Sequence, residues 1–218
     1  MTMLVHSLNI GRPQPENFHG KEVVSGICKQ PVAGPLALTF TGFAGDGVAD
    51  HKHHGGTDKA VCAYSGEHYG HWQAVLGISM PPAAFGENLT LLGLAEGDLC
   101  IGDSFRLGSA VVQVSQPRQP CKTLAARFGR ADFVKLVVDA GKTGWYFRVL
   151  EEGVVASGDR LTPLAEDPLR VTVAEANRIF HHDRRNLAGI ERVLAVAALS
   201  ASWQQSFREL LQKCGKAD

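Results

Sequence analysis

The chain has 218 residues, with 22 Lys and Arg against 22 Asp and Glu, so its formal net charge is zero. A neutral chain has no overall field that attracts nucleic acid or an acidic membrane surface, so we expect neither as a partner. Five scattered cysteines without a Cys-x-x-Cys pair argue against a disulfide framework and a four-thiolate zinc site. Since the sequence shows no secretory leader and no run of ~18 apolar residues, we expect a cytoplasmic protein without a membrane span.

Short apolar runs between glycine turns predict a β-rich region that extends to about residue 163. Trp145, Phe147 and Val149 alternate with polar positions, which turns Tyr146 and Arg148 to the opposite face of their strand. Many short strands favour a barrel or a sandwich over a Rossmann-type sheet. The predicted strands lie, in chain order, at residues 23–29, 35–41, 60–64, 99–107, 110–115, 144–150 and 153–156.

Helical spacing interrupts the strands at residues 67–76, 121–128 and 133–140. Beyond Pro168 the pattern becomes helical throughout. Thr172 and Glu175 fit a capping box at the start of one helix, and two further apolar stripes cover residues 187–198 and 203–214. These patterns predict a β-domain at residues 1–165 and a three-helix domain at residues 170–218.

Cys121 is the strongest candidate for a reactive group. The sequence places it in the first turn of a helix, close to Arg118 and Lys122, and both surroundings favour thiolate over thiol. A thiolate is the form that attacks an electrophile or binds a metal. The alternative is a buried cysteine that packs beneath the barrel. The other four cysteines continue apolar patterns and are expected to be structural: Cys28, Cys62, Cys100 and Cys214.

A basic, glycine-rich segment at residues 51–59 is the second candidate site. Its backbone N–H groups, with Lys and His nearby, suit a phosphate or another anion. Zinc is a weaker alternative because the His51, His53 and His54 spacing matches no zinc-site pattern. A solvated turn that binds no ligand is an alternative of equal weight to the anion site. Lys29 and Arg148 are further cations that either bind an anion or lie on the surface, and Asn88 either contacts a ligand or caps a turn.

Several segments, taken together and in order, resemble the MOSC domain family. The resemblance covers nearly the whole chain and is closest to the YiiM-like branch, which pairs a MOSC barrel with three C-terminal helices. It therefore implies a mainly β fold: a MOSC-type β-barrel with peripheral helices plus a C-terminal three-helix domain. The segments that carry it are residues 25–29, 52–56, 58–61, 85–89, 116–121, 143–150 and 158–159.

The resemblance also implies a molybdenum cofactor, a pyranopterin (molybdopterin) that carries a terminal phosphate. Cys121 matches the cysteine that supplies a thiolate to molybdenum in this family, and soft thiolate donors suit such a metal. The residues expected to contact the cofactor are Lys29, His53, His54, Gly55, Gly56, Asp58, Asn88, Arg118 and Arg148.

The implied reaction is the reduction of N-hydroxylated compounds such as 6-hydroxylaminopurine, which detoxifies base analogues. Cys121 would hold the metal, and His53 or His54 would supply a proton because imidazole titrates near neutrality. The sequence carries no flavin, nicotinamide or iron–sulfur signature, so a separate flavoprotein reductase is expected as the electron donor. The small N-hydroxylated substrate is the other expected partner, and a homodimer is compatible with the sequence.

Two other functions remain open at this point. The first is a module that binds and delivers the cofactor, or another sulfur- or phosphate-bearing ligand, without catalysis. The second is a thiol enzyme in which Cys121 is the nucleophile and a histidine is the base. Cofactor retention without turnover would indicate the first, and turnover by metal-free protein would indicate the second.

Overall fold

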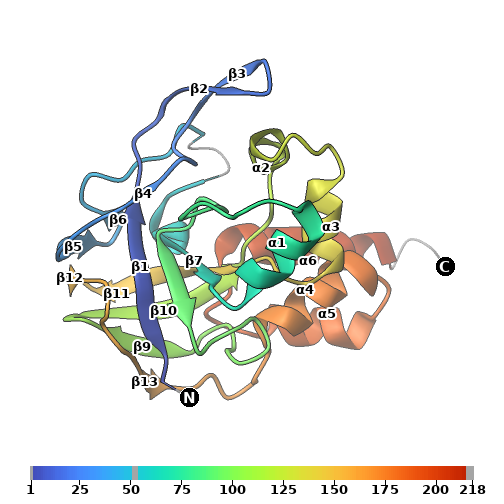
Figure 1. Ribbon diagram of the computed structural model, residues 1–218. Helices are drawn as coiled ribbons and strands as arrows, with labels where there is room; N and C mark the ends of the chain where they lie inside the picture. The colour runs from blue at the N-terminus through green and yellow to red at the C-terminus, as the bar shows by residue number, and fades with distance from the viewer. Residues whose placement is uncertain (1, 51–53, 215–218) are drawn as a thin grey trace.

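The computed structural model describes residues 2–50 and 54–214 and shows a curled β-sheet with three C-terminal helices packed at one end (Figure 1). This architecture confirms the predicted fold class. Eight strands form the main sheet in the order β13-β9-β10-β11-β7-β8-β1-β4, and β7 and β8 are parallel whereas the other neighbours are antiparallel. Their bounds are β1 Leu4–Ile10, β4 Gln30–Pro31, β7 Val61–Ser65, β8 Leu89–Leu92, β9 Ser104–Leu107, β10 Ala110–Pro117, β11 Trp145–Glu151 and β13 Leu161–Ala165.

The main sheet curls until its two ends meet. The N–H of Leu161 donates to the Met3 carbonyl at 3.0 Å, and the N–H of Val5 donates to the Asp159 carbonyl at 2.8 Å. These bonds join β1 to the segment that enters β13, so backbone groups that an open sheet would expose are paired. Two small sheets flank the barrel: β5 Leu36–Thr39 with β6 Gly42–Phe43 and β12 Gly153–Val155, and the hairpin of β2 Gln14–Phe18 with β3 Lys21–Ser25.

Each predicted strand overlaps an observed one, with two clear differences in bounds. The strand expected at residues 23–29 ends at Ser25, and the one expected at 99–107 begins at Ser104. The second difference has a local cause, because the Asp103 carboxylate accepts the Cys100 N–H at 2.8 Å and holds residues 100–103 in a turn. The strand patterns did not predict β1, β2, β4, β6, β8 or β13.

All three predicted helices within the β-region are present, as α1 His68–Leu76, α2 Lys122–Arg127 and α3 Phe133–Asp139. They enclose a small apolar core with Trp72, Phe85 and Phe133. The C-terminal helices are α4 Val173–His182, α5 Leu187–Leu194 and α6 Ala201–Cys214. Within the parts of the chain that are described, no helix has the length and apolar character needed to cross a bilayer.

The three C-terminal helices share the core of the barrel. One continuous cluster of buried apolar residues includes Phe147 from β11 together with Ile190 from α5 and Phe207 from α6. All three of these side chains have no exposed surface. Since separation of the helices from the barrel would expose this apolar area to water, the shared core holds them in place.

The start of α4 generates a stability prediction. The Thr172 side chain accepts the Glu175 N–H at 3.0 Å, as the capping box predicts. Thr172→Ala should lower the free energy of unfolding by about 1 kcal/mol, and Thr172→Ser should restore most of it, since serine keeps the acceptor. Urea unfolding measures both, with exposed Thr162→Ala as the control. Equal losses for Ser and Ala would show that the cap contributes nothing.

Candidate functional site

Cys121 lies where the chain leaves β10 and enters α2. It is the N-cap residue, with an extended backbone (φ −114°, ψ 168°), and α2 begins at Lys122. The sequence predicted Cys121 in the first turn of the helix, whereas in the structure Cys121 caps the helix from just outside it. The side chain is half-buried and packs beside the small core of α1, α2 and α3. The thiol therefore lies at an edge between apolar packing and the loop that contains His54.

The surroundings of Cys121 favour its thiolate. Burial acts to raise the pKa, but a hydrogen bond from His54 and the positive charge of Arg118 outweigh it and lower the pKa to about 6. The N–H of Leu124, in the first turn of α2, acts in the same direction. Cys121 is thus mainly ionised at neutral pH, which is the state that a metal ligand or a nucleophile requires.

Arg118 is a buried cation, with 5% of its surface exposed. Its backbone N–H donates to Gly144 at 3.0 Å and its Nη2 donates to the Phe85 carbonyl at 2.6 Å. Its Nη1 is buried and has no hydrogen-bond partner among the residues that the structure describes. A buried cation without a fully paired anion is costly, so this position favours negative charge such as the Cys121 thiolate.

Tyr146 is a site residue that the sequence motifs did not predict. It pairs with Cys62 of β7 and Gln116 of β10, and 7% of its surface is exposed. Burial raises the pKa of its phenol, while a hydrogen bond from Arg118 acts to lower it. The alternation of Trp145 and Phe147 was the signal that could have found Tyr146, since it placed this side chain on the face opposite the core.

Lys29 and Asn88 converge on Asp46. Lys29 is buried and forms an ion pair with the Asp46 carboxylate. Asn88 Nδ2 donates to Asp46 Oδ2 at 2.8 Å, and Asn88 Oδ1 accepts the Cys62 N–H at 3.1 Å. These contacts hold three loops together within the protein. The expected contact of Lys29 and Asn88 with a cofactor stays a prediction.

Asp58 and Arg148 lie against each other where the barrel meets α6. Arg148 Nη2 donates to Asp58 Oδ1 at 2.7 Å, and Asp58 Oδ2 accepts the Ala201 N–H at 3.0 Å. Arg148 Nη1 also donates to Gln113 at 3.0 Å. The pair therefore connects the barrel to the start of α6, and its predicted role toward a cofactor stays a prediction.

The glycine-rich loop is described from His54 onward, and the expected contacts of His51, Lys52 and His53 lie outside the described residues. Gly55 and Gly56 have φ values of 75° and 83°, which glycine adopts without strain. The turn that they form places the His54 side chain where it hydrogen-bonds to Cys121. The structure thus joins two candidate sites that the sequence treated separately, the loop and the cysteine.

Arg127 is a second residue that sequence reasoning missed. From the end of α2 its Nη1 donates to the Ile27 carbonyl at 2.8 Å and to the Ala83 carbonyl at 2.9 Å. Ile27 packs in the same apolar cluster as Cys121. Arg127 therefore holds two loops against α2, the short helix that follows Cys121. Its position in a helical pattern gave no signal of this role.

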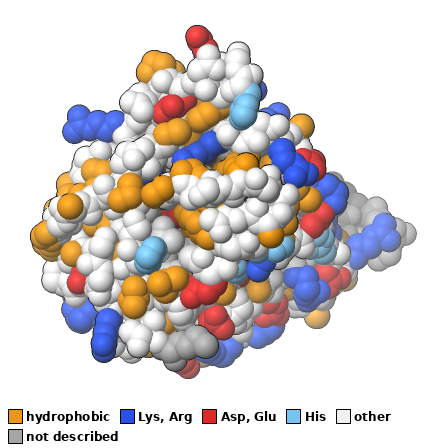
Figure 2. Space-filling view, viewed as in Figure 1, with side chains coloured by type: hydrophobic (Ala, Val, Ile, Leu, Met, Phe, Trp, Pro, Cys, Tyr) orange, Lys and Arg blue, Asp and Glu red, His pale blue; other side chains and the backbone are white. Residues whose placement is uncertain are grey.

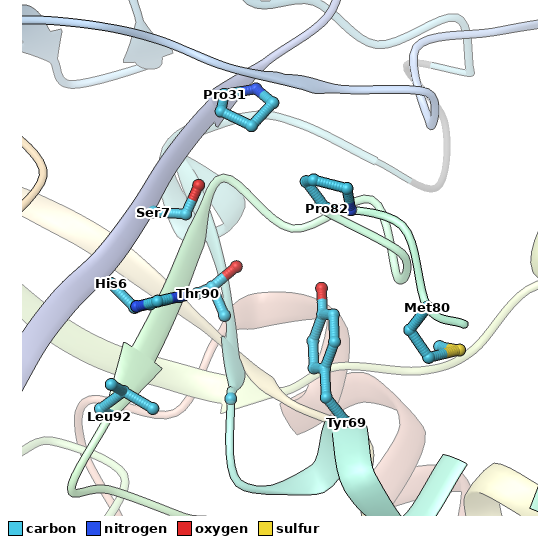
Figure 3. Close-up of a pocket in the computed structure, with 9 residues that line it drawn as sticks. His6, Ser7, Pro31, Tyr69, Met80, Pro82, Thr90 and Leu92 are labelled. Carbon is cyan, nitrogen blue, oxygen red and sulfur yellow. The ribbon is translucent and has the colours of Figure 1, made fainter. Parts of the chain in front are cut away.

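A surface pocket of about 450 Å³ lies outside the site around Cys121. Figure 2 shows this face of the molecule, where apolar side chains surround a recess below the β2–β3 hairpin. Beneath the pocket Glu87 is fully buried and accepts hydrogen bonds from Tyr69 and Thr90. Figure 3 shows its lining residues, which do not include Cys121: His6, Ser7, Pro31, Gly66, Tyr69, Met80, Pro82, Thr90 and Leu92.

The lowered pKa of Cys121 predicts a distinct alkylation profile. In metal-free protein the iodoacetamide rate at Cys121 should reach half its maximum near pH 6, whereas Cys28, whose pKa burial raises, should react at higher pH. His54→Ala should move the Cys121 profile to higher pH because it removes the hydrogen bond. Mass spectrometry of each thiol measures both rates. The same half-maximum for Cys121 and Cys28 would contradict the assignment.

The Asp58–Arg148 contact predicts energetic coupling. In a double-mutant cycle of Asp58→Asn and Arg148→Gln, we expect a coupling of about 1 kcal/mol in the free energy of unfolding, because the pair is partly shielded from water. Urea unfolding of the four proteins gives the coupling. Additive effects would mean that the ion pair does not stabilise this junction.

Comparison with known proteins gives matches to both parts of the chain. Residues 50–162 match the MOSC domain, and residues 171–213 match the YiiM-like, 3-alpha helix domain. YflK of Bacillus subtilis (strain 168) is 52% identical over 203 residues, covering 93% of this chain and 92% of that one. A protein named reductase from Gibberella moniliformis (strain M3125 / FGSC 7600) is 36% identical over 169 residues, which are 74% of this chain but 29% of that one.

Among solved structures, the crystal structure of YiiM from Geobacillus stearothermophilus superposes with a TM-score of 0.82 at 40% identity. The superposition covers 96% of this chain and 99% of that one, so the two proteins share both the barrel and the C-terminal helices. The motifs that suggested the resemblance are thus embedded in matching sequence and matching structure. This chain belongs to the MOSC domain family, in its YiiM-like branch.

Proposed function

We propose that this MOSC-domain protein is a molybdenum-cofactor-dependent reductase of N-hydroxylated compounds, such as 6-hydroxylaminopurine. The observation that carries the proposal is the Cys121 thiolate beside Arg118, a buried cation whose Nη1 is unpaired among the described residues. The reductase name of the Gibberella moniliformis relative supports a redox role.

The donor set fits the proposed cofactor. Cys121 offers a thiolate, a soft ligand suited to molybdenum, and its lowered pKa removes the need to deprotonate a neutral thiol. Arg118 offers a positive charge to an anionic group of the cofactor or substrate. When bound, the cofactor would supply two-electron redox chemistry, which no side chain of this protein provides.

The remaining tasks belong to this chain's own residues. Reduction of R–NHOH to R–NH₂ and water takes up two electrons and two protons. His54 lies next to Cys121, so it is placed to pass a proton between solvent and the reacting group. Because the small core of α1, α2 and α3 lies on one side of Cys121, a substrate would approach from the side of the His54 loop.

We further propose that the electrons come from a separate flavoprotein reductase. The sequence has no motif for a flavin, a nicotinamide or an iron–sulfur cluster. The Gibberella moniliformis reductase supports this view, since most of its length lies outside the match to this chain. The absence of a built-in electron carrier also favours the second candidate function, a module that binds and delivers the cofactor without turnover.

The proposal predicts metal content and activity together. Protein purified from a host that makes the cofactor should contain about one molybdenum per chain and reduce 6-hydroxylaminopurine when a flavoprotein reductase is supplied. Cys121→Ala should abolish both, whereas Cys28→Ala should keep both. Elemental analysis and a product assay measure them. Full activity in Cys121→Ala would overturn the proposal, and molybdenum retention without turnover would favour the delivery module.

A further inference from the structure

His6 and Ser7 of β1 are consecutive residues, and both line the surface pocket (Figure 3). In a regular strand successive side chains point to opposite faces, so only one of the two would face the pocket. The register of β1 against β8 explains the difference: Val5 pairs with Leu91 and Ser7 pairs with Thr90, which leaves His6 as an extra residue between them. Such a β-bulge turns a side chain in a new direction, and bulges are common next to functional sites.

The two hydroxyl groups in the pocket are hydrogen-bond acceptors for a ligand. Ser7 and Thr90 lie directly opposite each other on β1 and β8. The Ser7 hydroxyl donates to Asn9 Oδ1 at 2.6 Å, and the Thr90 hydroxyl donates to Glu87 Oε1 at 2.9 Å. Each hydroxyl proton is therefore already used, whereas each oxygen still has a lone pair. A ligand that binds both oxygens must donate hydrogen bonds to them.

The protein itself satisfies the buried carboxylate beneath the pocket. Besides the Thr90 hydroxyl, Glu87 accepts the Tyr69 O–H and, through Oε2, the Phe85 N–H at 3.0 Å. The Tyr69 oxygen in turn accepts the Ala84 N–H at 3.0 Å. None of the described residues that line the pocket is Lys, Arg, Asp or Glu. Because an unpaired charge is costly to remove from water, the pocket favours an uncharged ligand.

The walls of the pocket suit a flat ring. The Tyr69 ring, the rings of Pro31 and Pro82 and the Met80 side chain surround the space (Figure 3). Rings pack against flat surfaces, and methionine adapts its shape to the group that it contacts. The volume of about 450 Å³ falls within the roughly 300–1,000 Å³ of small-molecule sites. When neutral, the exposed His6 imidazole adds one donor and one acceptor.

We propose that this pocket binds an uncharged, planar nitrogen heterocycle. Its N–H groups donate to the Ser7 and Thr90 oxygens, and a ring nitrogen exchanges a hydrogen bond with His6. Adenine has these features, since it combines a flat ring with an amino group, a ring N–H and further ring nitrogens, so it is the probe for the site. The inference does not rest on the proposed function, because the pocket does not include Cys121.

NMR of the histidine side chains tests where adenine binds. Adenine titrated into the full chain should move the His6 imidazole signals with a Kd on the order of 1 mM. The signals of His54, which hydrogen-bonds to Cys121, report on the other site. His6→Ala and His54→Ala assign the two sets of signals. Saturable shifts at His6 are expected; shifts at His54 alone would place adenine beside Cys121 and overturn the inference.

The contacts themselves can be tested by saturation-transfer NMR of the adenine signals. His6→Ala and Ser7→Ala each remove one hydrogen-bonding group, so each should weaken adenine binding about fivefold. Purine, which keeps the ring N–H but lacks the amino group, should bind wild type about fivefold more weakly than adenine does. His182→Ala, at an exposed histidine at the end of α4, is the matched control and should bind adenine like wild type.

Equal adenine affinity in wild type, His6→Ala and Ser7→Ala would overturn the site. Equal affinity of wild type for purine and adenine would contradict donation to both hydroxyl oxygens. Circular dichroism checks the fold of each variant; if Ser7→Ala does not fold, His6→Ala and the purine comparison decide the matter. Loss of the reductase proposal through inactive cofactor-loaded protein would leave these binding results unchanged, so the two proposals fail separately.

Discussion

The charge of Arg118 is the feature on which the candidate site depends. A guanidinium with little access to water must be matched by negative charge nearby, and the charge of Arg118 lowers the pKa of the Cys121 thiol. The same charge reaches Tyr146 on the neighbouring strand. One buried cation thus acts on a thiolate and a phenol, and its Nη1 has no partner among the described residues, so a protein of zero net charge still has a local positive centre.

The fold holds Arg118 through backbone contacts that reach far along the chain. Gly144 accepts the Arg118 N–H and donates its own N–H to Glu96 at 2.7 Å, and Glu96 also contacts His68 at the start of α1. Gly144 has φ 77°, and a Cβ there would lie 2.4 Å from the Ala63 carbonyl oxygen, so glycine is required. Because Arg127 also fixes α2 to a neighbouring loop, the fold positions the residues of the site before any ligand binds.

Local patterns predicted a barrel or sandwich of short strands, the helices, the Thr172 cap and surroundings that favour a Cys121 thiolate, because each depends on residues close in sequence. They did not predict β1, where polar His6, Ser7 and Asn9 interrupt the alternation, or β13, which contains Pro163. The Lys29–Asp46 pair and the place of Tyr146 depend on loop packing and strand register, which the sequence does not reveal. Such contacts need the three-dimensional fold.

The pH dependence of folding tests the central claim, that the folded protein stabilises the Cys121 thiolate. Its pKa is about 6 when folded, against an ordinary thiol value of about 8.5, so between these values the unfolded chain binds more protons. The unfolding free energy of wild type minus that of Cys121→Ala should therefore rise by about 2–3 kcal/mol from pH 6 to pH 8.5. A difference that stays constant across this range would contradict the account.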